Sequence, residues 1–189
     1  MISNEAASSV EAIDDAPSAA VFGFRDHSQS YNLHSFPVTP RMSTYLFGFA
    51  AGPYTEYRLD SSASPPIGLY CRKSQARYLQ SVRDTIFDWT RKGLKFYEGF
   101  YGVAYPFSKY DYVFAPEFPE AEENPGCVFI SDSWIPKVSE PSKTSMFYFC
   151  SLLMHEMCHM WFGDLVTPQW WNDLWLKESM AEYFSYLCL

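Results

Sequence analysis

The chain has 189 residues, of which 48% are hydrophobic, 19% aromatic and 19% charged, a composition typical of a globular protein with a sizeable core. The formal net charge of −8 and the lack of a basic cluster argue against a nucleic-acid or anionic-membrane partner. No apolar run of about 18 residues, the length that spans a bilayer, is present. The five cysteines are scattered without a Cys-x-x-Cys pair, which indicates reduced thiols and not a disulfide framework.

The N-terminal part, residues 1–66, is predicted to form β-structure and turns. Within it, the apolar and aromatic residues 45–50 lie between turn signals and are predicted to form a buried strand. Residues 60–66 are polar and rich in proline, which suits a domain boundary or a long loop. Residues 67–71 are predicted to resume as a short strand.

The remaining elements alternate between helix and strand. Apolar residues recur at three- and four-residue steps from Ser74 to about Gly99 and predict an amphipathic helix. Residues 110–115 and 127–131 are predicted as strands separated by an acidic loop. Residues 144–162 are apolar nearly all round, which predicts a helix buried on most sides.

The end of this last helix and the start of the next carry capping signals. Gly163 is the predicted C-cap, and Pro168 prevents the helix from continuing. Asn172 is predicted to cap a following helix. These elements together predict an α+β fold.

The predicted helix 144–162 contains the motif His-Glu-x-x-His. His155 and His159 are four residues apart, so both side chains lie on one face and can bind one cation. Glu178, early in the following helix, supplies a third ligand and leaves an open position, as catalytic zinc requires. Glu156 is the predicted general base toward water. The alternative, two ordinary core histidines, would leave polar groups in apolar surroundings without an ion to satisfy them.

Two neighbouring residues bear on this zinc site. Glu182 lies one turn beyond Glu178 and is predicted to accept a hydrogen bond from the outer nitrogen of a ligating histidine. The alternative for Glu182 is a solvated surface carboxylate. Cys158 points away from the face of the two histidines and is predicted to be a small buried residue.

The sequence around the motif reads MHEMCHMWFGDLVT at 154–167 and WWNDLWLKE at 170–178. Both stretches closely resemble the zinc aminopeptidase N family, gluzincin metallopeptidases that remove single residues from peptide N-termini. Residues 39–46 are similar to the end of that family's N-terminal β-domain. The resemblance implies that residues 1–66 are the C-terminal part of that β-sheet domain. It also implies that residues 67–189 are the first part of a thermolysin-like zinc peptidase domain, so that the chain is a fragment.

The family also carries a Gly-x-Met-Glu-Asn motif, whose glutamate binds the free amine of the substrate. By this resemblance, Glu123 is the amine-binding residue and Asn124 follows it in the motif. Glu120 stands in place of the glycine and Glu122 in place of the methionine, which puts the alignment of the substrate in question. The alternative is that this acidic run is only a solvated loop.

The expected function is that of an aminopeptidase with one Zn²⁺ per chain, acting on peptides with a free N-terminus. No nucleic-acid partner and no membrane segment are expected. The alternative is a non-catalytic relative that binds peptides or scaffolds partners, as the altered loop would allow. A structural zinc site would close its fourth position with another protein ligand, and none stands at a suitable spacing. A cytoplasmic location is favoured, with targeting signals expected outside the fragment.

Overall fold

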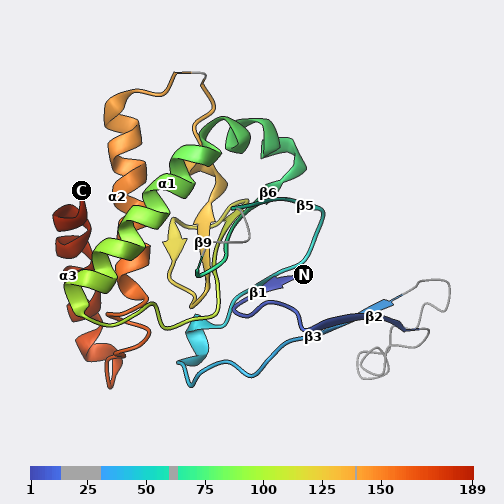
Figure 1. The fold of residues 1–189 in the computed structure, drawn as a ribbon, viewed down its shortest axis with the longest axis horizontal. Coiled ribbons are helices and arrows are strands. Elements are labelled where there is room, and N and C mark those ends of the chain that lie inside the picture. Colours follow the sequence, from blue (N-terminus) through green and yellow to red (C-terminus); the bar gives the residue numbers. More distant parts are fainter. Residues whose placement is uncertain (14–30, 60–63, 139) are drawn as a thin grey trace.

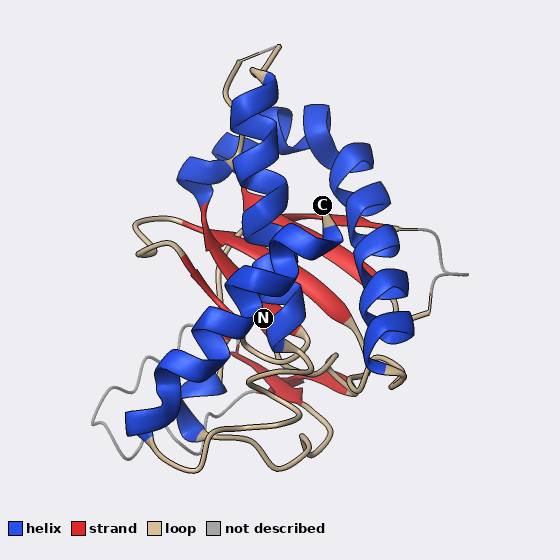
Figure 2. Ribbon diagram, turned by 90° about the vertical axis from the view of Figure 1, so that its left-hand side faces the viewer, coloured by secondary structure: helices blue, strands red, loops and turns tan. Residues whose placement is uncertain are grey.

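The central element of the fold is a mixed sheet of five strands in the order β5-β6-β7-β9-β8. A computed structural model describes residues 1–13, 31–59, 64–138 and 140–189. Within these ranges, three α-helices pack on the sheet, as Figures 1 and 2 show. The described residues therefore have the α+β architecture predicted from the sequence.

The elements follow one another along the chain in this way. The strands are β1 (Ile2–Ser3), β2 (Ser9–Ile13), β3 (Tyr31–Ser35), β4 (Phe49–Ala50), β5 (Tyr54–Arg58), β6 (Ile67–Arg72), β7 (Tyr110–Ala115), β8 (Ala121–Glu122) and β9 (Cys127–Ser131). The helices are α1 (Ala76–Tyr101), α2 (Lys143–His159) and α3 (Leu174–Cys188). Strands β2 and β3 form a hairpin that projects from the rest of the molecule (Figure 1).

The inner strands of the sheet run parallel, and its two edge strands run antiparallel to them. β6 pairs with β7 and β7 with β9 in parallel, with α1 as the crossover between β6 and β7. β5 pairs antiparallel with β6 on one side, and β8 pairs antiparallel with β9 on the other. β8 is thus an edge strand, and both of its residues line the cavity described below.

The inner strands β6, β7 and β9 are buried on both faces, and alternate residues of β7 belong to two different apolar clusters. On β7, Tyr112 and Phe114 pack in the cluster formed with the three helices. Val113 and Ala115 point the other way, into a smaller cluster that includes Ile2 from β1. The helices therefore cover one face of the sheet, and the N-terminal strands β1 and β4 cover part of the other.

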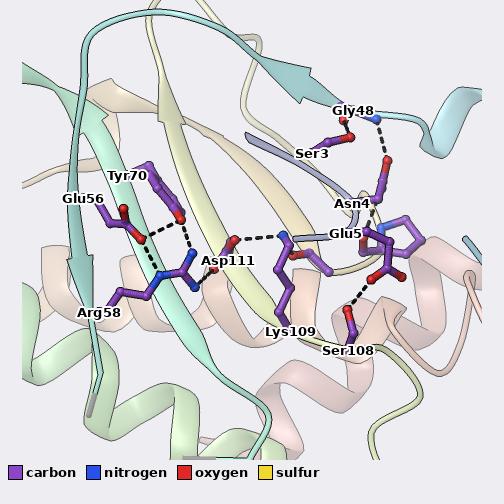
Figure 3. A network of polar contacts seen from close by, with 12 residues as sticks. Ser3, Asn4, Glu5, Gly48, Glu56, Arg58, Tyr70, Ser108, Lys109 and Asp111 are labelled. Carbon is purple, nitrogen blue, oxygen red and sulfur yellow. Dashed lines mark hydrogen bonds and ion pairs between the residues drawn. The ribbon is translucent and has the colours of Figure 1, made fainter. Parts of the chain in front are cut away.

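A polar network ties the N-terminal residues to the sheet (Figure 3). The buried Lys109 donates to the carbonyl of Gly126 at 2.8 Å and forms an ion pair with Asp111 at 2.8 Å. Arg58 pairs with the other oxygen of Asp111 at 3.1 Å. Asn4 donates to the carbonyl of Pro125 at 3.0 Å. The network thus fixes the backbone of residues 125–126, which lie just beyond Glu123 in the chain.

The structure confirms most of the predicted elements. The strands predicted at 67–71, 110–115 and 127–131 are β6, β7 and β9, and the amphipathic helix is α1. The helix predicted at 144–162 is α2, which ends earlier, at His159. β5 lies in the same sheet as β6, so the sheet includes residues on both sides of the domain boundary predicted near residue 66. Residues 60–63 of the predicted joint lie outside the described residues.

The prediction of a buried strand at residues 45–50 is wrong. Thr44–Leu46 form a turn of 3-10 helix, and only Phe49–Ala50 are extended, as β4. Phe47 is 59% exposed and Phe49 is 60% exposed, and among the described strands β4 pairs only with the two-residue strand β1. Apolar sequence alone did not reveal that so little structure covers this segment.

Both capping predictions and the predicted burial of α2 need correction. The C-cap of α2 is Met160, while Gly163 lies in the turn beyond it with φ 141°. A turn of 3-10 helix precedes α3. The N-cap residue of α3 is Asp173 and not Asn172, and the side chain of Asp173 makes no capping hydrogen bond. The N-terminal half of α2 exposes about half of Phe147 and Tyr148, so this helix is buried mainly in its second half. No described helix is both long and apolar enough to cross a membrane.

Candidate metal centre

Two packed helices bring the three predicted ligands together. His155 and His159 lie one turn apart near the end of α2, with their Nε2 atoms 3.1 Å apart. Glu178 comes from the second turn of α3, and its Oε2 atom lies 3.4 Å from the Nε2 atom of each histidine. The three donor atoms therefore form a nearly equilateral triangle.

This triangle has the size that a zinc ion requires. Donor atoms bound about 2.1 Å from a tetrahedral zinc ion are about 3.4 Å from one another. Two imidazole nitrogens and one carboxylate oxygen are also a usual donor set for catalytic zinc. Cys158 is not part of the triangle: it is buried, and its Sγ lies 3.1 Å from the hydroxyl of Tyr101. The residues present thus fit a zinc ion with three protein ligands.

The outer nitrogen of each histidine also has a partner. The Nδ1 atom of His155 lies 3.2 Å from a carboxylate oxygen of Glu182, and that of His159 lies 3.1 Å from the carbonyl of Phe162. Such partners fix the orientation of histidine rings that bind metals, and here the Nε2 atoms of both rings point toward Glu178. Hydrogen bonds from His155 and His159 hold the pKa of Glu178 well below its usual range, so this carboxylate is ionised.

Glu156 lies beside the triangle and is buried. Its side chain is 5% exposed, and its Oε2 atom has no hydrogen-bond partner in the structure. Burial raises the pKa of Glu156 to about 8. A buried carboxylate with a raised pKa can take up a proton near neutral pH, which suits a general base.

A buried lysine, which sequence analysis did not single out, joins the metal centre to the predicted amine site. Lys177 is 2% exposed, and its ammonium forms ion pairs with Glu123 and, at 2.8 Å, with Glu178. Burial opposes the charge, but the carboxylate of Glu123 raises the pKa of Lys177 above its ordinary value. The available signal was position: Lys177 directly precedes a predicted ligand.

Glu123 is held from two sides. Besides its pair with Lys177, it accepts a hydrogen bond from the hydroxyl of Tyr45 at 3.3 Å. Tyr45 belongs to the segment that was predicted wrongly as a strand, so this contact could not be foreseen. Glu123 is 4% exposed and is therefore not part of a freely solvated loop.

A cavity of about 730 Å³ connects these groups. Its lining includes residues of α2 and α3 together with residues 120–123, which run along the edge strand β8. Glu120 stands at the position of the glycine in the Gly-x-Met-Glu-Asn motif. Its φ is 153°, a backbone conformation that favours glycine. The structure thus brings all six predicted site residues to one cavity: His155, Glu156, His159, Glu178, Glu182 and Glu123.

Comparison with known proteins gives a consistent family assignment. The model of the peptidase family M1 domain matches residues 86–189, which is more than half of the chain. Aminopeptidase N of Streptomyces lividans is 43% identical over 162 residues, covering 83% of this chain and 18% of that protein.

More distant relatives agree with this match. Thyrotropin-releasing hormone-degrading ectoenzyme of Rattus norvegicus is 36% identical over 80% of this chain and 14% of its own length. Aminopeptidase Ey of Gallus gallus is 34% identical over 93% of this chain and 18% of its own length. The chain therefore spans less than a fifth of these relatives, and it belongs to peptidase family M1.

Proposed function

We propose that this chain carries the metal centre and the amine-binding loop of a zinc-dependent aminopeptidase. The observation that carries the proposal is the triangle of His155, His159 and Glu178 with the buried Glu156 beside it. The names of the relatives, which include aminopeptidase N and aminopeptidase Ey, support a peptidase that acts at the N-terminus.

In this proposal His155, His159 and Glu178 hold one zinc ion, and Glu182 orients His155. When bound, zinc supplies a Lewis acid that polarises the peptide carbonyl and makes water more acidic. Glu156 accepts the proton of the attacking water and then delivers it to the leaving amine. The raised pKa of Glu156 supports this double role, because a base near neutrality can also release its proton.

Glu123 would bind the ammonium of the substrate's first residue and so limit cleavage to one residue. Its carboxylate lines the same cavity as Glu156, and Tyr45 and Lys177 hold it in place. A fixed anchor for the amine positions the first peptide bond at the reacting groups. Such positioning lowers the entropic part of the activation barrier.

The domain assignment belongs to the same proposal. Residues 67–189 are assigned to the first part of a thermolysin-like peptidase domain, and residues 1–66 to the end of a β-sheet domain. The small sheet with an antiparallel edge strand, next to two metal-binding helices, supports the first assignment. In this assignment β5, from the first part, pairs with β6, from the second, so the two parts share one sheet.

The rival is a non-catalytic relative that binds peptides. The observation in its favour is the loop, where Glu120 has a backbone conformation suited to glycine and Glu122 replaces a methionine. An aminopeptidase cleaves small amino-acid amides and a non-catalytic relative does not, so an assay with such amides decides between the two functions.

The first test is the metal content of the purified full-length protein, measured by mass spectrometry. One zinc per chain is expected. Glu178→Ala should lose that zinc, whereas the exposed Glu117, outside the cavity, should tolerate the same change. The zinc-loaded protein is then assayed with fluorogenic amides of single amino acids. Folded protein without zinc, or zinc-loaded protein that releases no amino acid, would reject the aminopeptidase and leave the non-catalytic relative.

A further inference from the structure

Glu122 occupies a position in the cavity where the resembling motif has an uncharged methionine. It is the last residue of the edge strand β8 and directly precedes Glu123. Its side chain is half-buried and lines the cavity together with Glu156 and Glu178. A carboxylate therefore stands next to the predicted anchor for the substrate's amine.

Within the described part of the chain, no side chain forms a hydrogen bond or an ion pair with the carboxylate of Glu122. Lys177, the one lysine or arginine in the cavity lining, is already engaged by Glu123 and Glu178. Burial and the neighbouring charge of Glu123 raise the pKa of Glu122 to about 7. A raised pKa is expected for a carboxylate without a cation beside it. A cation brought by a ligand would stabilise the charged form of Glu122.

The charge of the whole cavity points the same way. Six glutamates line it, against one lysine. A zinc ion and the ammonium of a substrate together add three positive charges, which leaves the cavity acidic if the carboxylates are ionised. Glu156 is an independent observation: this residue lines the cavity and is 5% exposed, and its buried Oε2 atom has no hydrogen-bond partner among the described residues. The balance of charges in the cavity therefore favours a substrate that carries a further positive charge.

We infer that Glu122 binds the side chain of the substrate's first residue and selects lysine or arginine there. The inference rests on the proposed function, since Glu123 must hold the substrate's amine. Glu122 and Glu123 are consecutive residues whose side chains both line this cavity, and the substrate's first side chain begins on the carbon that carries the amine. A lysine or arginine side chain anchored at Glu123 therefore reaches Glu122.

The other glutamates of the lining are less suited to this role. Glu182 already pairs with His155 at 3.2 Å, and Glu178 with both histidines. Glu120 is exposed at the rim. Glu122 alone combines partial burial, a free carboxylate and direct proximity to Glu123.

The test compares the full-length, zinc-loaded protein on coumarin amides of lysine, arginine and norleucine. Norleucine matches the carbon chain of lysine without its charge, so the ratio of kcat/KM for the two amides measures charge selection. The expected ratio favours lysine by about tenfold or more, the effect of one charge-assisted contact in a partly buried site. Glu122→Gln should abolish this preference by raising KM for the lysine amide, so that the ratio of kcat/KM between the lysine and norleucine amides of this variant falls to about one.

The matched control is Glu117→Gln, which changes an exposed glutamate outside the cavity and should keep the preference. Cleavage of the norleucine amide as fast as the lysine amide would overturn the inference and leave the aminopeptidase function standing. A lysine preference that survives Glu122→Gln would also overturn the role of Glu122. No cleavage of any amide would reject the proposed function, and the inference with it.

Discussion

One wall of the cavity is formed by the helices α2 and α3, and another by the edge strand β8 with the residues around it. On the helices, every predicted ligand lies where its spacing requires. On the loop, Glu120 adopts a glycine-like conformation, and Glu122 lacks a partner among the described side chains. The helical wall depends on local geometry, whereas the loop wall depends on contacts from elsewhere, such as that of Lys177 with Glu123. Substitutions can therefore be aimed at either wall, or at the ion pair of Lys177 with Glu123 that links them.

The largest effect is expected on the helical wall, from Glu156→Gln. This change keeps the size of the side chain and removes the base, so kcat should fall by about 10²- to 10⁴-fold. Zinc content should be unchanged, because Glu156 is not one of the three ligands. Steady-state kinetics and metal analysis of the same preparation check both points. Normal turnover in this variant would show that Glu156 is not the base.

The next effect tests whether the two walls are coupled through Lys177. Lys177→Met removes a buried ammonium and leaves Glu123 without its charged partner, at a cost of about 3–5 kcal/mol in the free energy of unfolding. KM should rise because Glu123 is no longer fixed. Thermal unfolding and substrate titration measure the two effects.

Lys177→Arg serves as the companion variant, because it keeps the charge and changes only its shape. It should recover part of the lost stability. If Lys177→Met unfolds at the temperature of the unmodified protein and keeps its KM, the buried pair does not join the walls.

A smaller effect is expected from Glu182→Ala, which removes the partner of the outer nitrogen of His155. Loss of such a partner typically weakens metal binding by about 10- to 100-fold. Competition with a zinc chelator measures the affinity. Tyr183→Ala alters the adjacent exposed residue of α3 and should leave the affinity unchanged. Equal affinities in both variants would mean that Glu182 is only a surface carboxylate.

The helical wall was the part of the site that sequence could predict. A four-residue spacing determines that His155 and His159 share a face, and one further turn places Glu182 beyond Glu178. The core strands and α1 also followed from their apolar patterns. These features depend on periodicity within one element, which the sequence contains directly.

The features that sequence did not reveal depend on tertiary packing. Residues 45–50 are as apolar as a buried strand, but in the part of the chain that the structure describes only the two-residue strand β1 pairs with them. Tyr45 instead contacts Glu123. Lys177 looked like any helical lysine until α3 was placed against Glu123. The role predicted for Glu123 came from the family resemblance and not from spacing, because no periodic rule links a loop to a helix.

The smallest effect is expected on the loop wall, from substitutions that change the backbone strain at Glu120. Its φ of 153° is a conformation that glycine adopts readily and other residues adopt at a cost of about 1–3 kcal/mol. Glu120→Gly and Glu120→Ala remove the same carboxylate, but only glycine also removes the Cβ atom that causes the strain. Glu120→Gly should therefore unfold at a higher temperature than Glu120→Ala, by the equivalent of about 1 kcal/mol after the greater chain entropy of unfolded glycine is allowed for. Equal unfolding temperatures would mean that the loop relaxes around the side chain, and that the departure from glycine changes charge at the cavity rim without straining the amine site.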